Sequence, residues 1–145
     1  MSIFAPSPWA SRMLSVLRIV AGLLFLLHGT NKLFGYPPNP SMFPPMAFPA
    51  MSLPWIAGCL EIIGGSLLII GLFTRPVAFL HSGEMAVAYF MVHFPNGFWP
   101  LTNLGEAAVL YCFIWLYFAF AGGGAWSVDS MLASRRMAST SKGLG

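Results

Sequence analysis

Long apolar stretches alternate along the chain with short polar or proline-rich segments. Four stretches reach the length of about 20 mostly apolar residues that a membrane-spanning helix needs. They cover residues 13–34, 53–73, 76–94 and 103–122. The first has the shortest uninterrupted apolar run, Ile19–Leu27, flanked by Arg18 and Lys32, whose long side chains can reach the two membrane surfaces. The pattern predicts an all-α fold, a four-helix transmembrane bundle.

The positive charges predict how this bundle is oriented. Arg12 precedes the first stretch, Arg75 lies between the second and third, and Arg135 and Arg136 follow the fourth. Because connections that carry Lys and Arg stay in the cytoplasm, both termini are predicted to be cytoplasmic. The first stretch ends in the polar run 28–32 rather than in a small-x-small cleavage site, so we expect it to remain in the membrane as a span.

Residues 36–52 form the longest connection. Six prolines exclude a regular helix there, although apolar side chains continue through the segment. We interpret it as a lid that lies at the membrane interface or folds over the bundle. Its methionines Met42, Met46 and Met51 raise the alternative of a soft-metal site, but packing is the favoured interpretation and no metal is expected.

Composition narrows the classes of function. Apolar residues make up 57% of the 145 residues and charged residues 8%, against about 25% charged residues in a soluble domain. Such a chain needs the lipid bilayer as its solvent. Basic residues are scattered, which excludes nucleic-acid binding. Cys59 and Cys112 have neither the spacing of a CxxC pair nor the company of a zinc site, so we expect buried thiols, with a redox pair across two helices as the alternative.

The chain is predicted to form one membrane domain. This domain covers residues 1–133, and residues 134–145 are predicted to be a polar, mobile tail. Within the second span, glycines recur seven residues apart, at Gly58 and Gly65 and again at Gly64 and Gly71. Small residues let helix backbones approach closely in a membrane, so we expect the second helix to be central.

Acidic residues inside the spans are the candidates for chemistry. Glu61, Glu84 and Glu106 fall in the second, third and fourth spans, and the first contributes His28 and Lys32 on one face. A charged side chain in mid-bilayer is costly unless it is paired, protonated or facing water. At about 1.5 Å of rise per residue, all five lie within about 15 Å of the outer ends of their spans. They could therefore meet in the outer half of the bundle.

Two further polar residues extend this group. His81 lies one turn from Glu84, and Asn103 one turn from Glu106, whereas His93 projects from the opposite face. The group is interpreted either as a packing network or as a polar cavity that binds a small molecule or relays protons. An interface with another membrane subunit is a third interpretation.

The order and spacing of several residues also match a known family. The pieces are Arg18 with His28-Gly29 and Lys32-Leu33, Glu61–Gly65 followed by Gly71–Arg75, Asn103 with Glu106, and Gly122–Asp129. With these pieces the chain resembles, over most of its length, the DoxX family of small four-helix bacterial membrane proteins. The resemblance implies a location in the bacterial inner membrane.

The resemblance also implies a redox-associated function. The family is similar to the membrane subunit of a thiosulfate:quinone oxidoreductase, so a quinone is the implied ligand, and a redox enzyme subunit or a second copy of the chain is the implied partner. Its polar positions match Arg18, His28, Lys32, Glu61, Asn103, Glu106 and Asp129. We interpret Arg18, Gly64, Gly65, Gly71, Arg75 and Asp129 as structural, with Ser127 or Asp129 capping a short interfacial helix.

The resemblance assigns no reaction, so it leaves open whether the chain is an enzyme. Two alternatives to a redox role therefore stand. One is a proton-coupled small-molecule transporter, which the three membrane glutamates favour. The other is a structural accessory subunit without an activity of its own. Haem held by His28 and His81 is disfavoured because their depths in the membrane differ by about 10 Å.

Overall fold

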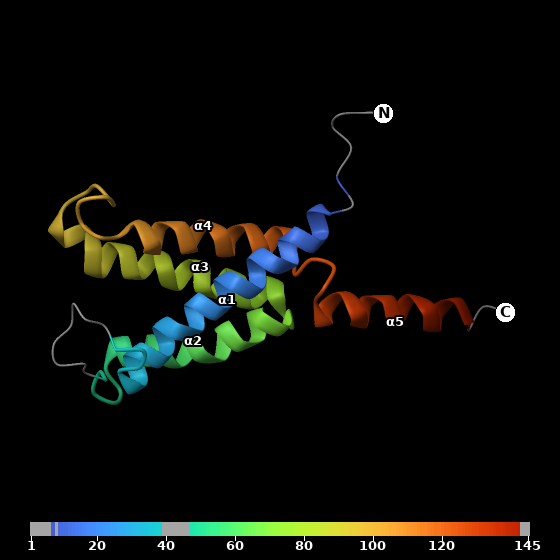
Figure 1. The fold of residues 1–145 in the computed structure, drawn as a ribbon, viewed down its shortest axis with the longest axis horizontal. Helices are drawn as coiled ribbons and strands as arrows, with labels where there is room; N and C mark the ends of the chain where they lie inside the picture. The colour runs from blue at the N-terminus through green and yellow to red at the C-terminus, as the bar shows by residue number, and fades with distance from the viewer. Residues whose placement is uncertain (1–6, 8, 39–46, 143–145) are drawn as a thin grey trace.

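The computed structural model describes residue 7 and residues 9–38 and 47–142, and within them every regular element is a helix (Figure 1). The elements are α1 (Ala10–Phe34), α2 (Leu53–Ile70), α3 (Thr74–Ala88), the π-helical turn η1 (Tyr89–His93), the 3₁₀ turn η2 (Phe94–Asn96), α4 (Glu106–Ala121) and α5 (Val128–Lys142). The all-α prediction is confirmed.

Glycines and a serine set the ends of the first two helices. Gly35 and Gly71 follow α1 and α2 in the left-handed conformation, with φ of 65° and 72°. Ser52 caps α2, because its Oγ accepts a hydrogen bond from the Trp55 N–H at 3.4 Å. The second helix ends at Ile70 rather than at residue 73, since the left-handed Gly71 cannot continue it.

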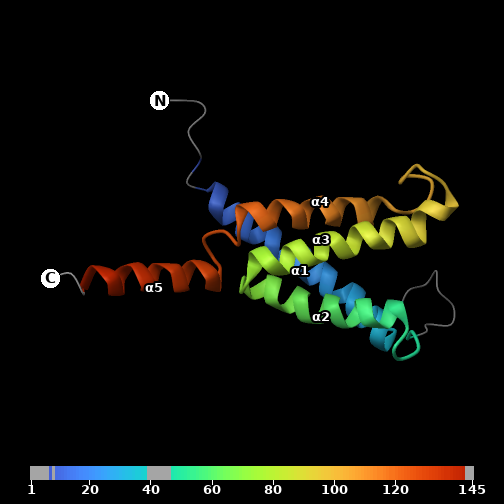
Figure 2. The same cartoon turned by 180° about the vertical axis from the view of Figure 1, so that it is seen from behind.

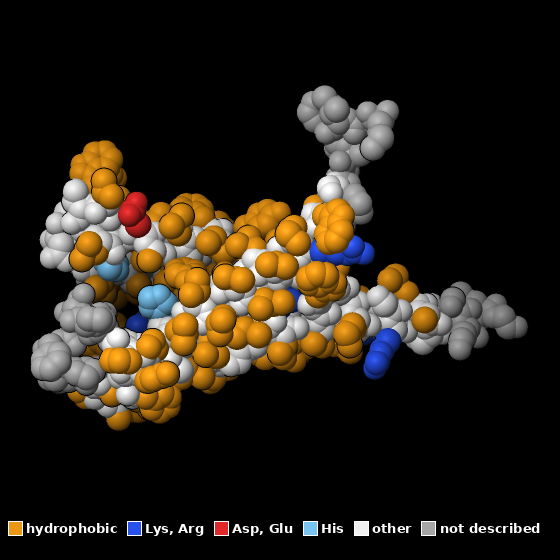
Figure 3. Space-filling model, viewed as in Figure 1, with side chains coloured by type: hydrophobic (Ala, Val, Ile, Leu, Met, Phe, Trp, Pro, Cys, Tyr) orange, Lys and Arg blue, Asp and Glu red, His pale blue; other side chains and the backbone are white. Residues whose placement is uncertain are grey.

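Three helical segments are long and apolar enough to cross a membrane: Ala10–Phe34, Leu53–Ile70 and Thr74–Asn96. The first, whose apolar run is the shortest, is the longest single helix, with 25 residues. α4 has only 16 residues, which at about 1.5 Å each cover about 24 Å of a hydrocarbon core about 30 Å thick. The fourth span therefore stays a prediction. Large apolar side chains cover the visible face of the packed helices (Figure 3).

The helices pack as two close pairs. α1 lies along α2 and α3 along α4, and contacts between α2 and α3 join the pairs (Figures 1 and 2). Glycines allow the first pair to approach closely: a Cβ on Gly29 would lie 2.8 Å from the Gly58 carbonyl oxygen, and one on Gly65 would lie 3.1 Å from the Gly22 carbonyl oxygen. The small-residue spacing of α2 thus places Gly58 and Gly65 against α1.

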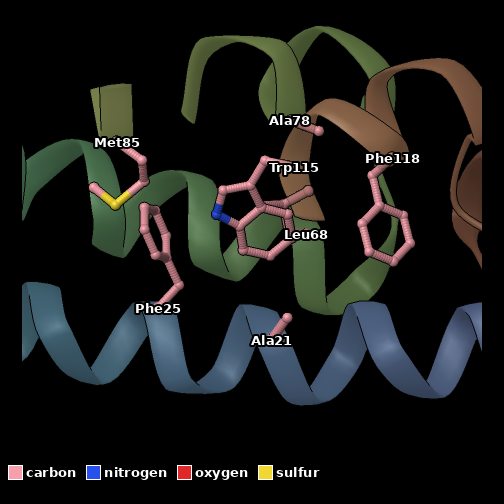
Figure 4. Close-up of a cluster of buried hydrophobic side chains, with 7 residues drawn as sticks. All are labelled: Ala21, Phe25, Leu68, Ala78, Met85, Trp115 and Phe118. Atoms are coloured by element: carbon pink, nitrogen blue, oxygen red, sulfur yellow. The ribbon is translucent and has the colours of Figure 1, made fainter. Parts of the chain in front are cut away.

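A core of apolar side chains fills the space between the pairs (Figure 4). Phe25 of α1 lies edge-on to Trp115 of α4, with ring centroids 5.4 Å apart. The other members come from all four helices: Ala21, Leu68, Ala78, Met85 and Phe118. This core separates the two ends of the packed helices from each other.

The fifth helix begins where the sequence predicted a cap. Ser127 Oγ accepts a hydrogen bond from the Ser130 N–H at 3.2 Å, and α5 then runs to Lys142. The predicted tail, residues 134–145, therefore starts inside a helix. α5 continues away from α1–α4 along their common direction rather than across their ends (Figures 1 and 2), which differs from the interfacial orientation that we expected.

The predicted lid, residues 36–52, is described only in part. Residues 39–46, which include Met42 and Met46, lie outside the described residues. Its described part touches the end of α1. The Asn31 side-chain amide donates to the Pro37 carbonyl at 2.7 Å, and the Phe48 N–H donates to the Lys32 carbonyl at 2.9 Å. The connection is thus fastened to the last turn of α1 at two points.

Candidate functional site

An ion pair between Lys32 and Glu61 joins the last turn of α1 to the middle of α2. Lys32 Nζ lies 2.6 Å from Glu61 Oε1, and the two side chains are 24% and 2% exposed. Gly29 and Gly58, each one turn away, bring the backbones close enough for this contact. The second carboxylate oxygen, Glu61 Oε2, is buried without a hydrogen-bond partner among the described residues. The pair therefore connects the surface to the interior.

A second pair lies on α3, one turn apart. His81 Nδ1 lies 2.6 Å from Glu84 Oε2, and the two side chains are 1% and 11% exposed. The His81 ring packs edge-on to Phe25 at 4.8 Å and points its Nε2 at α2. Gly64 makes room for it there, because a Cβ on Gly64 would lie 1.6 Å from His81 Nε2. His81 Nε2 and Glu84 Oε1 have no hydrogen-bond partners in the described part of the chain.

The two pairs form one group, which we call the polar cluster: Lys32, Glu61, His81 and Glu84. Glu61 lies one turn before Gly64 on the same face of α2, so His81 packs next to it. Three helices thus contribute to the cluster, whereas the sequence predicted a group from all four spans.

An open pocket of about 360 Å³ lies between α1 and α4 and is called the His28 cavity. Its walls come from α1, α4 and the start of the α1–α2 connection: Leu24, Leu27, His28, Asn31, Pro37, Pro38 and Tyr111. Figure 3 shows a hollow at this end of the molecule, with histidine and Lys or Arg side chains visible in it. The site therefore combines apolar walls with polar groups.

Aromatic rings connect the cavity to the cluster. His28 lies edge-on to Tyr111 at 6.0 Å, and Tyr111 contacts Phe25 at 5.4 Å, which in turn contacts His81. Neither the His28 ring nor the Tyr111 hydroxyl has a hydrogen-bond partner among the residues that the structure describes. Both groups are therefore free to bind a molecule in the cavity.

Asn103 and Glu106 lie outside the polar cluster. Asn103 is buried in the α3–α4 connection, where its side chain accepts from the Gly105 N–H at 2.8 Å and donates to the Gly97 carbonyl at 2.7 Å. Glu106 is exposed at the start of α4. At about 100° per residue it projects roughly opposite to Ala108, which faces the core. Their depth was compatible with the cluster, but their direction is not.

Arg18 organises the opposite end of the molecule. Its guanidinium is fully buried, and all three nitrogens donate to backbone carbonyls. Nε donates to Gly123 at 2.8 Å, Nη1 to Ile69 at 2.7 Å and also to Leu68, and Nη2 to Trp126 at 2.6 Å. These carbonyls belong to the last turn of α2 and to the connection between α4 and α5. We call this set the Arg18 network.

Asp129 extends the Arg18 network to α3. Its two carboxylate oxygens accept hydrogen bonds from the Phe73 and Thr74 N–H groups, at 2.9 and 2.8 Å, and its own N–H donates to Gly71 at 3.0 Å. The carboxylate thus caps the N-terminus of α3. Arg75 is exposed beside it. This geometry gives Arg18, Gly71 and Asp129 a role in joining helices.

Comparison with known proteins identifies the family. The family model DoxX matches residues 13–94, which is more than half of the chain. The chain belongs to the DoxX family. All four residues of the polar cluster, together with His28 and Arg18, lie inside the matched DoxX segment, whereas Tyr111 and Asp129 lie beyond it.

Relatives support a DoxX-type membrane protein. An uncharacterized protein of Haemophilus influenzae is 44% identical over 125 residues, covering 81% of this chain and 88% of that protein. "Inner membrane protein YqjF" of Escherichia coli is 30% identical over 119 residues, covering 81% and 89%. "Putative oxidoreductase CatD" of Bacillus subtilis is 32% identical over 65 residues, covering 45% and 48%. No solved structure matches the chain. This DoxX chain is therefore a membrane protein.

Tyr111 is the site residue that sequence reasoning missed. It lies in a helix with five other aromatic residues, so nothing in its neighbourhood distinguishes it from a packing residue. The one available signal is its phenol, a hydrogen-bond donor within an otherwise apolar stretch, since buried tyrosines usually need a partner. In this DoxX structure its position beside His28 gives the cavity a second donor.

Proposed function

We propose that the chain is a quinone-binding membrane subunit of a redox system, and that the His28 cavity is its binding site. The observation that carries this proposal is a pair of polar groups, His28 and Tyr111, that have no hydrogen-bond partner among the described residues and lie on the wall of an otherwise apolar cavity. A quinone has a flat ring and carbonyl oxygens that accept hydrogen bonds. The cavity volume of about 360 Å³ is within the usual range of small-molecule sites.

The position of the cavity also favours a ligand that arrives from the bilayer. Its apolar wall is formed by Leu24 and Leu27 of α1, and Leu24 is 47% exposed on the outside of the helices. A long apolar tail could therefore leave the cavity between α1 and α4 and remain in lipid. A bound quinone would supply electron- and proton-carrying chemistry, while this chain's residues bind the ring, orient it and keep it beside the polar cluster.

We further propose that four helices cross the inner membrane and leave both termini in the cytoplasm. The Arg18 network supports this topology, since it brings the start of α1, the α2–α3 turn and the end of α4 to one end of the molecule. Arg12, Arg75 and the two arginines of α5 lie at that end. Lys32 lies at the other end, but Glu61 neutralises it.

The relatives support the redox part of the proposal only through one name. The Bacillus subtilis protein is named as an oxidoreductase, and the matched part covers 48% of it. Quinone binding itself needs no partner protein. Electron transfer would need a redox enzyme that delivers electrons to the quinone or takes them from it.

Binding of a short-chain ubiquinone or menaquinone to the purified chain in lipid nanodiscs tests the proposal. We expect saturable binding, weakened about fivefold by Tyr111→Phe, because one hydrogen bond contributes about 1 kcal/mol. His28→Ala should weaken binding at least as much, since it removes a donor and a ring. Tyr117→Phe, on the exposed side of the same helix, is the matched control and should bind as the unaltered chain does. Absent binding, or equal binding by all variants, rejects the proposal.

A second candidate is a proton-coupled transporter of small molecules. The buried, unpartnered oxygens Glu61 Oε2 and Glu84 Oε1 favour it, because transporters bind protons on such carboxylates. Solute flux in proteoliposomes should then respond to a pH gradient and be lost in Glu61→Gln. Flux that is indifferent to both the gradient and the substitution rejects this candidate.

A further inference from the structure

The charges of the polar cluster do not balance unless one more proton is present. Lys32 contributes one positive charge, and Glu61 and Glu84 one negative charge each when ionised. The two carboxylates belong to one buried group, because His81 packs against Gly64, one turn from Glu61. Among the described residues Lys32 forms its ion pair with Glu61, so an ionised Glu84 would rely on His81 for a positive charge. An uncompensated charge in this buried site is costly.

The packing of His81 argues against a second proton on its ring. Nδ1 lies 2.6 Å from Glu84 Oε2, and it donates to this oxygen if the ring carries its hydrogen there. Nε2 faces the Cα of Gly64 so closely that a Cβ there would lie 1.6 Å away. A hydrogen on Nε2 would collide with the Gly64 Cα hydrogens and would find no acceptor, whereas a bare nitrogen lone pair fits against them. His81 is therefore neutral, and the balancing proton belongs to a carboxyl group.

No other charged group faces the carboxyls from the packed helices that the structure describes. α1 contributes Lys32, with His28 beyond the Phe25 and Tyr111 rings, and α2 contributes Glu61 alone. α4 contributes the neutral Tyr111 phenol and the Trp115 indole. Arg18, the next cation of α1, is about 21 Å from Lys32 at 1.5 Å per residue and donates to carbonyls.

We infer that Glu61 and Glu84 bind one exchangeable proton between them, because Lys32 compensates the charge of one of the two carboxylates only. The site is a proton-binding site built from three helices, and it exists whether or not a quinone binds next to it. Release is a proton transfer alone: the O–H bond of the protonated carboxyl breaks, the carboxylate keeps the electron pair, and a solvent water beside the partly exposed Lys32 takes up the proton.

The bound proton exchanges with solvent at one end of the molecule only. On the cavity side, Glu84 and Glu61 lead to the partly exposed Lys32. On the other side, the fully buried Leu68, Ala78, Trp115 and Phe118 separate His81 from the Arg18 network. None of these four side chains can ionise at physiological pH. The interior beyond His81 therefore gives the proton no path.

Infrared spectroscopy of the full-length chain in lipid nanodiscs near neutral pH tests the proton count, because a protonated carboxyl has its own C=O band. We expect one such band, which shifts in heavy water. Glu84→Gln should abolish it. Lys32→Met should about double it, since neither carboxyl then has a cation and both take up a proton.

The exposed Glu106 provides the matched control, and Glu106→Gln should leave the band unchanged. No protonated band in the unaltered chain, or a band that survives Glu84→Gln, overturns the inference. If Glu84→Gln does not fold, the increase in Lys32→Met still decides the question, because its absence would equally overturn it. Quinone binding plays no part in these spectra, so their outcome is independent of the proposed function.

Proton conductance tests the one-sided access. Liposomes that contain the chain, a potassium gradient, valinomycin and an internal pH dye should leak protons no faster than empty liposomes. A leak that depends on the protein and disappears in Glu84→Gln would show a path to both sides and overturn this part of the inference.

Discussion

Both ends of the packed helices bury charged side chains, but the hydrogen bonds of these side chains are satisfied to different degrees. At one end, buried Arg18 satisfies its donors with carbonyls of the chain itself, and Asp129 satisfies two N–H groups of α3. At the other end, Glu61, His81 and Glu84 each keep a buried polar atom without a partner among the described residues. Both ends bury charge, but at the Arg18 end the unpartnered atom among the described residues is the Thr74 hydroxyl, whereas at the second end such atoms belong to ionisable side chains. This difference separates a structural network from a candidate site.

Removing Arg18 should have the largest effect on this comparison. Arg18→Met leaves the carbonyls of Leu68, Ile69, Gly123 and Trp126 without their donors. We expect a loss of about 3–5 kcal/mol of stability, as for other broken buried polar networks. Thermal or denaturant unfolding in detergent measures it, with Arg136→Met on the exposed face of α5 as the control. Equal stability of the two variants would contradict a structural role for Arg18.

Two glycines offer a matched test at the cavity end. Gly64→Ala places a Cβ 1.6 Å from His81 Nε2, so His81 must move, at a cost of about 1–3 kcal/mol typical of overpacking. Gly83 on α3 has nothing within 4 Å of its Cβ position, and Gly83→Ala should therefore be neutral or stabilise the helix by up to about 1 kcal/mol. Unfolding midpoints of both variants give the answer. Similar losses in both would show that the contact with His81 does not matter.

The cap on α3 should give the smallest effect. Asp129→Ala removes both acceptors from the Phe73 and Thr74 N–H groups, and loss of a helix cap costs about 1 kcal/mol. Asp129→Asn keeps one acceptor and should lose less. The same unfolding assay ranks the two variants, and quinone binding should be unchanged in both because they alter the end away from the His28 cavity. A large loss of binding would mean that the two ends are coupled.

Much of the fold and part of the site followed from the sequence. Glycine spacing on α2 correctly predicted close helix contacts, because small residues have few other uses in a membrane helix. The side chains of Lys32, Glu61 and Glu84 were recognisable as candidates because hydrocarbon forces charged groups to find partners. Which pairs form could not be predicted, since that depends on how α2 and α3 are rotated against each other.

The fourth helix shows why the rest of the candidate site could not be predicted from the sequence. α4 is apolar on all sides, so no stripe of polar residues indicated which face is inward. Depth and the family resemblance made Glu106 a candidate, and neither gave a reason to select Tyr111. Asn103 was placed by helix counting, but the α3–α4 connection uses its side chain to hold Gly97 and Gly105. Residues 134–145 were likewise predicted to be a mobile tail, although α5 continues as far as Lys142.

The arrangement of α1–α4 as two close pairs has a mechanical consequence. The glycine contacts make α1 and α2 a stiff unit, because any sliding would drive one backbone into the other. The His28 cavity lies on the seam between this unit and α4. Its width therefore depends on the angle between the α1–α2 pair and the α3–α4 pair, which meet along α2 and α3. A small rotation of one pair against the other can admit or release a ligand while every helix stays intact.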